Sequence, residues 1–361
     1  MTAGRLAPGR RPPQILSVIG ARPEIIQAAP LSVALAPLAD EVLVHTGQHY
    51  DAAMSENQIL AIRLPSPRHN LEVGSRPDLE QLAVGTERLL RIIALERPDA
   101  VLVRGDTNGT LSGARAAAAA GLPLLHVEAG LRSYRVDMPE ERNRVETDRL
   151  ADVLFAPTEH AARTLRAEGA RGAVHVTGDP LCDILESLRD RIRPAAGDYV
   201  LATVHRDYNT NDPARLASVL GCLARVPWPV IFPVHPRTRT SIAAWDLAVP
   251  ANVTLVEPVT YPRMLELERG ARAVATDSGG VQREAYLWGV PCLTLREETE
   301  WIETVETGWN ALVGVDADAF AEALARPLPA ERPRLFGDGA AAPRIARLTV
   351  KFLREKLEEA A

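Results

Sequence analysis

The sequence contains few aromatic residues and no long apolar run. Phe, Trp and Tyr make up 4% of its 361 residues, so the core must consist mainly of aliphatic side chains and alanine, which is typical of helices packed on buried strands. No apolar segment reaches the ~18 residues that a membrane-spanning helix needs. Arg22, Pro23 and Glu24 interrupt the N-terminal segment that would form a signal-peptide core. We therefore expect a cytoplasmic protein with no membrane partner.

Cysteine is also scarce, and the charge is not strongly biased. The cysteines Cys182, Cys222 and Cys292 match no metal-ligand spacing and lie in or beside apolar segments, which indicates buried reduced thiols. A formal net charge of −6 gives no support to a nucleic-acid partner, although local arginine clusters could bind a small polyanion. A P-loop, a GxGxxG fingerprint, a metal cluster and a Ser/His/Asp arrangement are missing too. Binding of a phosphorylated metabolite remains open.

Short apolar runs alternate with helical patterns along the chain, which predicts βαβ units, parallel sheets and an α/β fold. The length favours two Rossmann-like domains, which we place at residues 1–185 with 345–361 and at residues 186–344. The last helix, over 343–360, is expected to pack back on the N-terminal domain. Strands are expected at 15–20, 41–47, 99–107, 122–130, 153–158, 174–179, 199–206, 230–238, 253–258, 273–280 and 291–296. Helices are expected at 25–36, 79–96, 110–121, from 139, and at 159–168, 213–225, 261–269 and 281–288.

Acidic residues follow two of the expected strands. Asp106 and Glu128 each come just after an apolar run, and in parallel sheets ligands bind beyond the carboxyl ends of the strands. A helix is expected from Pro139, where Glu140 and Arg144 would share one face. A solvated, salt-bridged helix would also explain this stretch. We expect Arg132 and Arg144 to orient the carboxylates or to contact a ligand.

The motif TDSGGVQREA (276–285) predicts a phosphate-binding turn. Ser278, Gly279 and Gly280 lie between a strand and a helix, where free N–H groups and the helix dipole would hold a phosphate. Glu284 could accept hydrogen bonds from ribose hydroxyls. A simple strand-to-helix turn is the alternative.

Basic pairs end two strands of the second half. His205 with Arg206, and His235 with Arg237, would face the same side as the glycine turn and could neutralise a diphosphate leaving group. Acids and bases in the first half are Arg22, His49, Asp106, Glu128, Arg132 and Glu140. The set predicts proton transfer combined with stabilisation of a leaving group.

With these residues in view, the chain resembles the non-hydrolysing UDP-N-acetylglucosamine 2-epimerase family over residues 18–314. The family's motifs occur in its order and spacing: GARPEIIQAAPL, HTGQHYD, RGDTNGTL, HVEAGLRS with PEERNR, PTEHA, TGDPLCD, TVHR, PVHPRT and TDSGGVQREA. The resemblance implies two domains facing across a cleft, as in B-type glycosyltransferases. It also implies a UDP-sugar substrate, no metal or nicotinamide cofactor, and a homodimer.

The resemblance further implies a mechanism and residue roles. The C2 proton is removed, UDP leaves to give a 2-acetamidoglycal, and UDP adds back with protonation on the opposite face. By motif position, the catalytic residues are Asp106, Glu128, Glu140 and His205. Residues matched to UDP and sugar binding are Arg22, Ser278, Gly279, Gly280 and Glu284, beside which we place Arg132, Arg144, Arg206 and His235. Gln48 and His49 match the family's regulatory site.

Four departures leave the exact substrate open. Gln27 stands where members of this family commonly have lysine, and Tyr208 stands where a glutamate is common. Trp301 replaces an arginine of the family's motif, and Asp51 replaces a glutamine of its regulatory site. The form around Trp301 looks like relatives that act on other 2-acetamido sugars, including 2,3-diacetamido uronates. Hydrolysis to free ManNAc and UDP, a B-type glycosyltransferase and a non-catalytic UDP-sugar sensor are alternatives to UDP-GlcNAc epimerisation.

Overall fold

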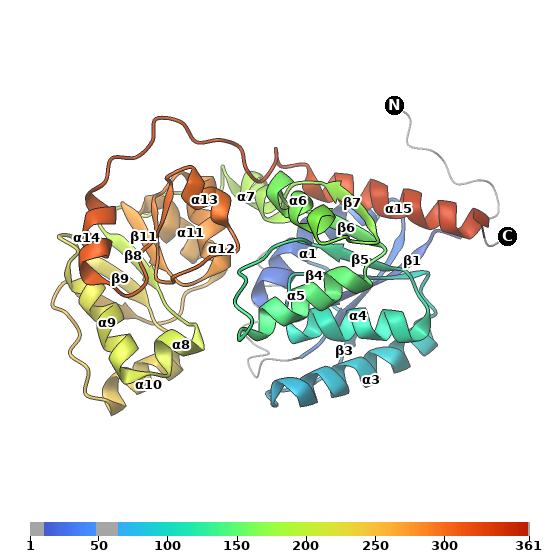
Figure 1. Cartoon of the computed structure of the whole chain (residues 1–361), viewed down its shortest axis with the longest axis horizontal. Helices are drawn as coiled ribbons and strands as arrows, with labels where there is room; N and C mark the ends of the chain where they lie inside the picture. Colours follow the sequence, from blue (N-terminus) through green and yellow to red (C-terminus); the bar gives the residue numbers. More distant parts are fainter. Residues whose placement is uncertain (1–10, 48–63, 360–361) are drawn as a thin grey trace. The chain divides into compact units, whose positions relative to one another are not determined.

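The chain forms two compact units, each built on a parallel sheet (Figure 1). The computed structural model describes residues 11–47 and 64–359. One unit contains the described residues up to Glu186 and those from Phe336 onward, and the other runs from Ser187 to Leu335. The chain thus returns to the first unit at 336 rather than at the expected 345. Phe336 is already buried there, and its carbonyl oxygen accepts a hydrogen bond from the Asp179 N–H at 3.1 Å.

Among the described residues, seven parallel strands form the sheet of the first unit in the order β3-β2-β1-β4-β5-β6-β7. The strand order changes direction between β1 and β4, and ligands of open α/β sheets bind at such a switch point. The strands are β1 (Gln14–Ile19), β2 (Asp40–His45), β3 (His69–Asn70), β4 (Ala100–Arg104), β5 (Leu124–Val127), β6 (Val153–Ala156) and β7 (Ala173–Val176).

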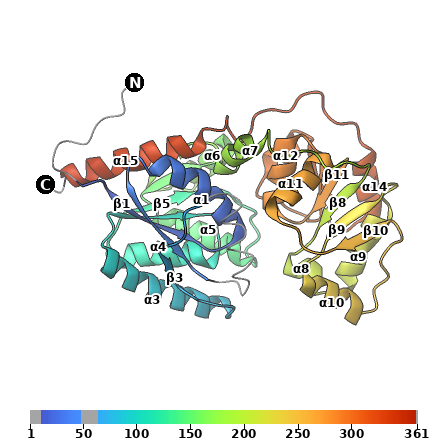
Figure 2. The ribbon, with the colours of Figure 1, turned by 180° about the vertical axis from the view of Figure 1, so that it is seen from behind.

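Helices cover this sheet and close its core. The C-terminal helix α15 (Ala341–Glu359) lies beside α1 (Arg22–Leu35) in both views (Figures 1 and 2). Ile345 and Leu353 of α15 pack with Leu31 of α1 against Leu102 and Phe155 of the sheet, which confirms that the last helix packs on the N-terminal unit. The other helices in the described part of this unit are α3 (Asp78–Glu96), α4 (Asn108–Ala120), α5 (Pro139–Leu150), α6 (Glu159–Ala167) and α7 (Pro180–Leu188).

The second unit repeats this architecture with a six-stranded sheet in the order β10-β9-β8-β11-β12-β13 over the residues described. All pairs are parallel, and the switch point lies between β8 and β11. The strands are β8 (Val200–Thr203), β9 (Val230–Pro233), β10 (Val253–Val256), β11 (Ala273–Thr276), β12 (Cys292–Thr294) and β13 (Asn310–Leu312).

Separate cores cover the two faces of the second sheet. Phe232 packs with Val219 of α9 and Phe320 of α14 on one face, and Leu201 packs with Leu267 of α11 and Val281 of α12 on the other. The helices are α8 (Asp207–Thr210), α9 (Pro213–Ala224), α10 (Pro236–Ala244), α11 (Tyr261–Gly270), α12 (Gly279–Trp288), α13 (Ile302–Glu306) and α14 (Ala317–Ala325).

Several short elements differ from the sequence predictions. The strands expected from the sequence do not include β3, which pairs with β2 for only two residues. A two-residue strand is too short to show periodicity. The strand expected at 230–238 ends at Pro233, because Pro236 begins α10 instead. The three cysteines are free and buried, as expected, and burial raises the pKa of the Cys182 thiol to about 12. No helix in the described part of the chain is both long and apolar enough to cross a membrane.

Candidate active site

Asp106 lies in the turn that follows β4 at the first switch point. Gly105 has a φ of 68°, which places the backbone in the left-handed region that glycine tolerates best. Its N–H donates to the Val127 carbonyl oxygen at 3.1 Å, which ties the turn to β5. The Asn143 side-chain amide of α5 donates to the Asp106 carbonyl oxygen at 3.1 Å. Neighbouring elements therefore fix the Asp106 backbone from two sides.

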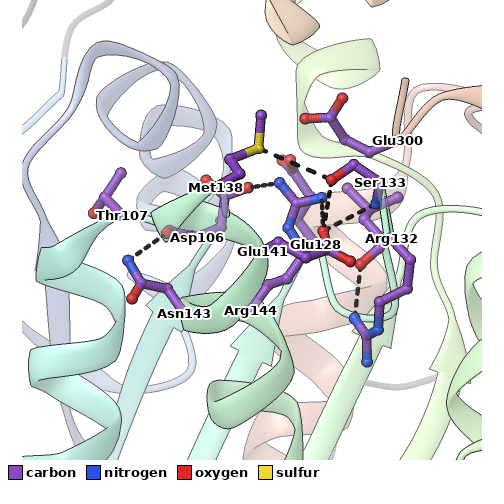
Figure 3. Close-up of polar contacts among 12 residues, drawn as sticks. Asp106, Thr107, Glu128, Arg132, Ser133, Met138, Glu141, Asn143, Arg144 and Glu300 are labelled. Carbon is purple, nitrogen blue, oxygen red and sulfur yellow. Dashed lines mark hydrogen bonds and ion pairs between the residues drawn. The ribbon is translucent and has the colours of Figure 1, made fainter. Parts of the chain in front are cut away.

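Arg144 orients the Asp106 carboxylate. The Arg144 side chain is 2% exposed, its Nη2 contacts Asp106 Oδ2, and its Nη1 lies 3.1 Å from Glu141 Oε2 (Figure 3). The Asp106 side chain is 28% exposed, so it remains accessible to a ligand. Arg144, expected among the substrate-binding residues, is thus a buried link between two carboxylates. A direct contact with the sugar stays a prediction.

Glu128 projects from a constrained backbone at the end of β5. Its φ of 69° is uncommon for a residue with a side chain and is typical of functional sites. The N–H groups of Glu128 and Ala129 both donate to the Phe155 carbonyl oxygen of β6, each at 3.1 Å. The buried Gln27 of α1 donates a side-chain hydrogen bond to Glu128 Oε2. Glu128 itself is partly exposed, so a ligand can reach it.

A buried ionic cluster supports the loop after Glu128. Asp148 Oδ1 lies 2.8 Å from His126 Nδ1, and its Oδ2 accepts from Arg132 at 2.7 Å and from the Gly130 N–H at 3.2 Å. Burial acts to raise the pKa of Asp148, but the hydrogen bond and charge of His126, together with Arg132, hold that pKa below its usual value. Arg132 also contacts Glu168 at 2.7 Å. These contacts make Arg132 a support of the loop, and its contact with substrate stays a prediction.

Gly130 allows this loop to pass close to α6. Its φ is 87°, and a Cβ atom there would lie 2.4 Å from the Ala161 carbonyl oxygen. No larger residue fits this approach without displacing backbone. The glycine therefore fixes the path of the chain between Glu128 and Arg132.

The first turn of α5 holds the next part of the loop. Glu141 accepts hydrogen bonds from the N–H groups of Ser133 and Tyr134 and from the Ser133 hydroxyl, each at 2.9 Å. This anchoring agrees with a structural reading of Glu141. Glu140, the second residue of the helix, is partly exposed, and its catalytic role stays a prediction.

Glu24 joins the turns after β1 and β4, and sequence reasoning assigned it no role. Its Oε1 accepts hydrogen bonds from the Thr107 hydroxyl at 2.6 Å and the Thr110 hydroxyl at 2.9 Å, and its Oε2 accepts from the Ala21 N–H at 2.9 Å. Burial raises the pKa of Glu24 despite these hydrogen bonds. Ala21 has no side-chain acceptor, so the sequence lacks the Ser/Thr-x-x-Glu signature of a capping box and offered no such local signal for Glu24. Arg22, two residues earlier, is partly exposed at the start of α1.

The glycine turn of the second unit forms the N-terminus of α12. The Ser278 hydroxyl caps the helix by accepting from the Val281 N–H at 3.5 Å, and Gly279 and Gly280 are partly exposed in its first turn. First-turn N–H groups lack partners within a helix and point toward its positive dipole end. The turn therefore forms a helix N-terminus as expected, and phosphate binding there stays a prediction.

Glu284 lies one turn further along α12 and is held by Tyr261. The Tyr261 hydroxyl donates to Glu284 Oε1 at 2.8 Å, and both residues are buried. Tyr261 begins α11, so this bond links the two helices on one face of the sheet. Sequence reasoning missed Tyr261, because nothing local to it indicates a partner 23 residues away.

Asp277 organises the basic segment after β8. This buried carboxylate accepts hydrogen bonds from the backbone N–H of Arg206 at 3.0 Å and from the Asn209 side chain at 2.9 Å. Its Oδ1 also lies 3.3 Å from Nδ1 of His205, whose side chain is half exposed. The second switch point thus brings His205 and Arg206 beside the strand that leads into the glycine turn.

His235, expected to contact substrate, has a local structural role. Its Nδ1 accepts from the Arg237 N–H at 3.2 Å and so caps α10, while Arg237 pairs with Asp207 at 2.5 Å. His235 is exposed, and a substrate contact stays a prediction.

Trp301 lies beside the glycine turn and is almost fully buried. The Arg283 guanidinium stacks over its ring at 4.1 Å, and a Cβ atom added to Gly279 would lie 3.1 Å from Trp301 Nε1. Tyr208 packs under Arg215 at 5.4 Å, and burial raises its pKa. These two departures from the family pattern thus fill space around the predicted nucleotide site.

Two predicted regulatory residues, Gln48 and His49, lie outside the described residues, as does Asp51. Within residues 11–47 and 64–359, no group of three or more His, Cys, Asp and Glu side chains is arranged to hold a metal ion.

The family follows from comparison with known proteins. A family model described as UDP-N-acetylglucosamine 2-epimerase matches residues 33–349. A Methanococcus maripaludis protein named UDP-N-acetylglucosamine 2-epimerase homolog is 39% identical over 352 residues, covering 93% of this chain and 99% of that protein. The UDP-2,3-diacetamido-2,3-dideoxy-D-glucuronate 2-epimerase of Pseudomonas aeruginosa is 39% identical over 355 residues, covering 94% and 100%.

A solved structure agrees along nearly the whole chain. The crystal structure of Methanocaldococcus jannaschii UDP-GlcNAc 2-epimerase in complex with UDP-GlcNAc and UDP has a TM-score of 0.85 at 35% identity and covers 94% of this chain and 99% of that chain. Fold and sequence thus define an α/β isomerase. The chain belongs to the UDP-N-acetylglucosamine 2-epimerase family, which confirms the resemblance.

Proposed function

We propose that the chain inverts C2 of a UDP-2-acetamido sugar, in the simplest case converting UDP-GlcNAc to UDP-ManNAc. A base removes the C2 proton, the C1–O bond breaks, and UDP leaves to give a 2-acetamidoglycal. UDP then re-forms the C1–O bond while C2 receives a proton on its opposite face. No net oxidation or hydrolysis occurs. The observation that carries this proposal is the pair of accessible carboxylates, Asp106 and Glu128, at the ends of adjacent strands.

The carboxylates match what the proton transfers require. Removing a weakly acidic C–H proton and returning it to the other face takes acid and base groups held in fixed positions. Asp106 is oriented by Arg144, and Glu128 by Gln27. Glu140 is the third candidate at this end of the sheet. Variants of these carboxylates must determine which one transfers the proton on each face of the sugar.

The second unit supplies groups suited to a departing diphosphate. The α12 N-terminus offers backbone N–H donors, and charge that develops on a leaving group is stabilised by such preorganised donors. His205 and Arg206 add cationic or hydrogen-bonding groups at the same switch point, and Glu284 is suited to ribose hydroxyls. We propose that UDP binds this unit and assign the proton transfers at C2 to the carboxylates of the first unit.

The sugar itself is the open part of the proposal. Relatives of equal identity include a protein named for UDP-GlcNAc chemistry and one named for a 2,3-diacetamido uronate. Both substrates share the UDP group and the C2 acetamido group, so the same chemistry serves either. We also propose a homodimer, which sedimentation analysis of the purified chain would measure.

The test is a product analysis. The full chain is incubated with UDP-GlcNAc and, separately, with UDP-2,3-diacetamido-glucuronate, and the products are identified by NMR. We expect a UDP-linked 2-epimer from at least one of them. Free ManNAc without UDP-ManNAc would instead establish hydrolysis, and transfer to an acceptor with C2 unchanged would establish a glycosyltransferase.

Variants of the carboxylates complete this test. We expect Asp106→Asn and Glu128→Gln to lower turnover by at least about 100-fold, the contribution of a positioned acid or base. Glu146→Gln is the matched control on α5. Glu146 forms a half-exposed ion pair with Arg115, with 2.7 Å between Arg115 Nε and Glu146 Oε1, and neither residue is a candidate for the site. Unchanged turnover in both carboxylate variants would indicate a different catalytic site, whereas binding of the UDP-sugar without turnover in the wild type would indicate a non-catalytic sensor.

A further inference from the structure

We propose that Gln27 is a positioning residue that holds Glu128 through a neutral hydrogen bond and thereby sets the pH range in which Glu128 works. This inference rests on the proposed function, because it gives Glu128 a proton-transfer role. It goes beyond that function by assigning a role to the side chain at position 27, to which the proposed reaction assigns none.

Helix α1 contributes a hydrogen bond to the Glu128 carboxylate. The Glu128 backbone is fixed by the Phe155 carbonyl oxygen of β6 and adopts a φ of 69°. This backbone conformation limits the directions in which the side chain can leave the strand end. The Gln27 side-chain amide then donates from α1 to Glu128 Oε2. Three elements, β5, β6 and α1, thus contribute to the position of this carboxylate.

The chemical nature of Gln27 determines what this contact does. Gln27 is 2% exposed, so its amide meets Glu128 with little competition from water. A neutral N–H donor favours the ionised carboxylate, but it does so less strongly than a cation at the same place. The amide therefore fixes Glu128 while leaving it more basic than an ammonium group would. A more basic carboxylate is the better acceptor for a weakly acidic C–H proton.

Other charged groups around Glu128 stay the same when position 27 is varied. Those on the surrounding elements are Arg22 and Glu24 of α1, Asp106 after β4, Arg132 in the loop after β5, and Glu140, Glu141 and Arg144 of α5. Arg144 is engaged by Asp106 and Glu141, and Arg132 by Asp148 and Glu168. Only the side chain at position 27 differs between the variants, so a difference between their pH profiles is assigned to that side chain.

The experiment compares two substitutions with opposite electrostatic effects in the full-length enzyme. Exchange of the C2 proton with solvent is measured from pH 4 to 10 for the wild type, Gln27→Met and Gln27→Lys. Glu128→Gln identifies which limb of the profile belongs to Glu128. Gln27→Met keeps the side-chain length without the donor, and we expect that limb to move to higher pH and the rate to fall roughly tenfold. Gln27→Lys adds a charge, and we expect the same limb to move down by about 1 to 3 pH units.

Ser32→Ala is the matched control. Ser32 is a buried polar residue of the same helix, and its hydroxyl has no hydrogen-bond partner in the described structure. We expect it to keep the wild-type profile. Thermal unfolding of each variant shows whether α1 still folds, and profiles of folded variants alone are compared.

The outcomes separate this inference from the proposed function. If wild-type enzyme exchanges the C2 proton but both Gln27 variants keep its pH profile, the role of Gln27 is wrong while the function stands. A shift of the limb in the same direction in both variants also overturns it, because a merely structural role would not distinguish a neutral from a charged replacement. If the wild type exchanges no C2 proton with any UDP-2-acetamido sugar tested, the proposed function fails first.

Discussion

Asp277 holds the backbone of His205. Both carboxylate oxygens of this fully buried side chain accept from the His205 N–H, at 3.1 and 3.2 Å, and Oδ1 lies 3.3 Å from Nδ1 of the ring. The carboxylate therefore sets both the path of the segment after β8 and the orientation of the imidazole. A residue at the end of one central strand thus controls a candidate catalytic group at the end of its neighbour.

We expect Asp277→Asn to lower turnover through misplacement of His205. The amide nitrogen would replace one acceptor and face N–H donors, and small displacements of a catalytic group cost about 10- to 100-fold in rate. Steady-state kinetics with the UDP-sugar substrate measure this loss. Asp212→Asn is the control, since Asp212 is an exposed cap of α9 that accepts from the Ala214 and Arg215 N–H groups. An equal loss in both variants would contradict the role of Asp277.

Tyr261→Phe is expected to weaken UDP binding about tenfold, because it removes the buried donor that orients Glu284. Isothermal titration calorimetry with UDP measures the change. Tyr286→Phe on α12 is the matched control, since it loses a hydroxyl that donates to the Pro333 carbonyl oxygen at 2.6 Å and should keep wild-type affinity. Unchanged affinity in Tyr261→Phe would show that this orientation of Glu284 does not serve UDP.

Asp148→Asn is expected to lower the free energy of unfolding at pH 7 by about 3 kcal/mol, because it takes from the buried Arg132 guanidinium its buried carboxylate partner. The pKa of Asp148 is lowered in the fold, so its stabilisation is present above the usual Asp value of about 3.9 and is lost as the pH falls through the folded value. Chemical denaturation at pH 7 and near pH 3 should show the difference between wild type and variant shrinking in acid. Glu168→Gln, which affects the more exposed partner of Arg132, should cost less than about 1 kcal/mol. Equal effects of the two variants would contradict the buried cluster.

Glu24→Gln tests the opposite sign of pH dependence. Burial raises the pKa of Glu24 in the folded protein. The contribution of Glu24 to folding stability is therefore fully present below the usual Glu pKa of about 4.3, and it is lost as the pH rises through the pKa of the folded state. Glutamine stays neutral throughout. The thermal midpoint of the variant relative to wild type should therefore increase between pH 4.5 and 7.5. A constant difference over that range would show that Glu24 does not titrate in this way.

The sequence indicated the framework of the site better than its contacts. Apolar runs and the residues after them located Asp106, Glu128 and the glycine turn, because the carboxyl ends of parallel strands share one edge. The side-chain partners of these residues could not be predicted from the sequence. Gln27 and Glu128 are 101 residues apart, and Asp277 lies 72 residues from His205. No local period encodes such pairs, which depend on how strands are ordered in the sheet.

Arg132 and Arg144 illustrate the same limit. Their positions beside acidic residues predicted either support of the carboxylates or contact with a ligand, and local sequence could not separate the two. In the structure both side chains support carboxylates. They are 3% and 2% exposed, respectively, and each contacts two carboxylates.

Deuterium incorporation at C2 tests the proposed epimerase reaction most directly. The full chain is incubated with its UDP-2-acetamido sugar in deuterated water, and the first product formed is examined by NMR and mass spectrometry. We expect each newly formed epimer to carry one deuterium at C2 while remaining linked to UDP. An epimer that retains its original hydrogen at C2 would contradict the proton-transfer mechanism and the roles proposed for Asp106 and Glu128.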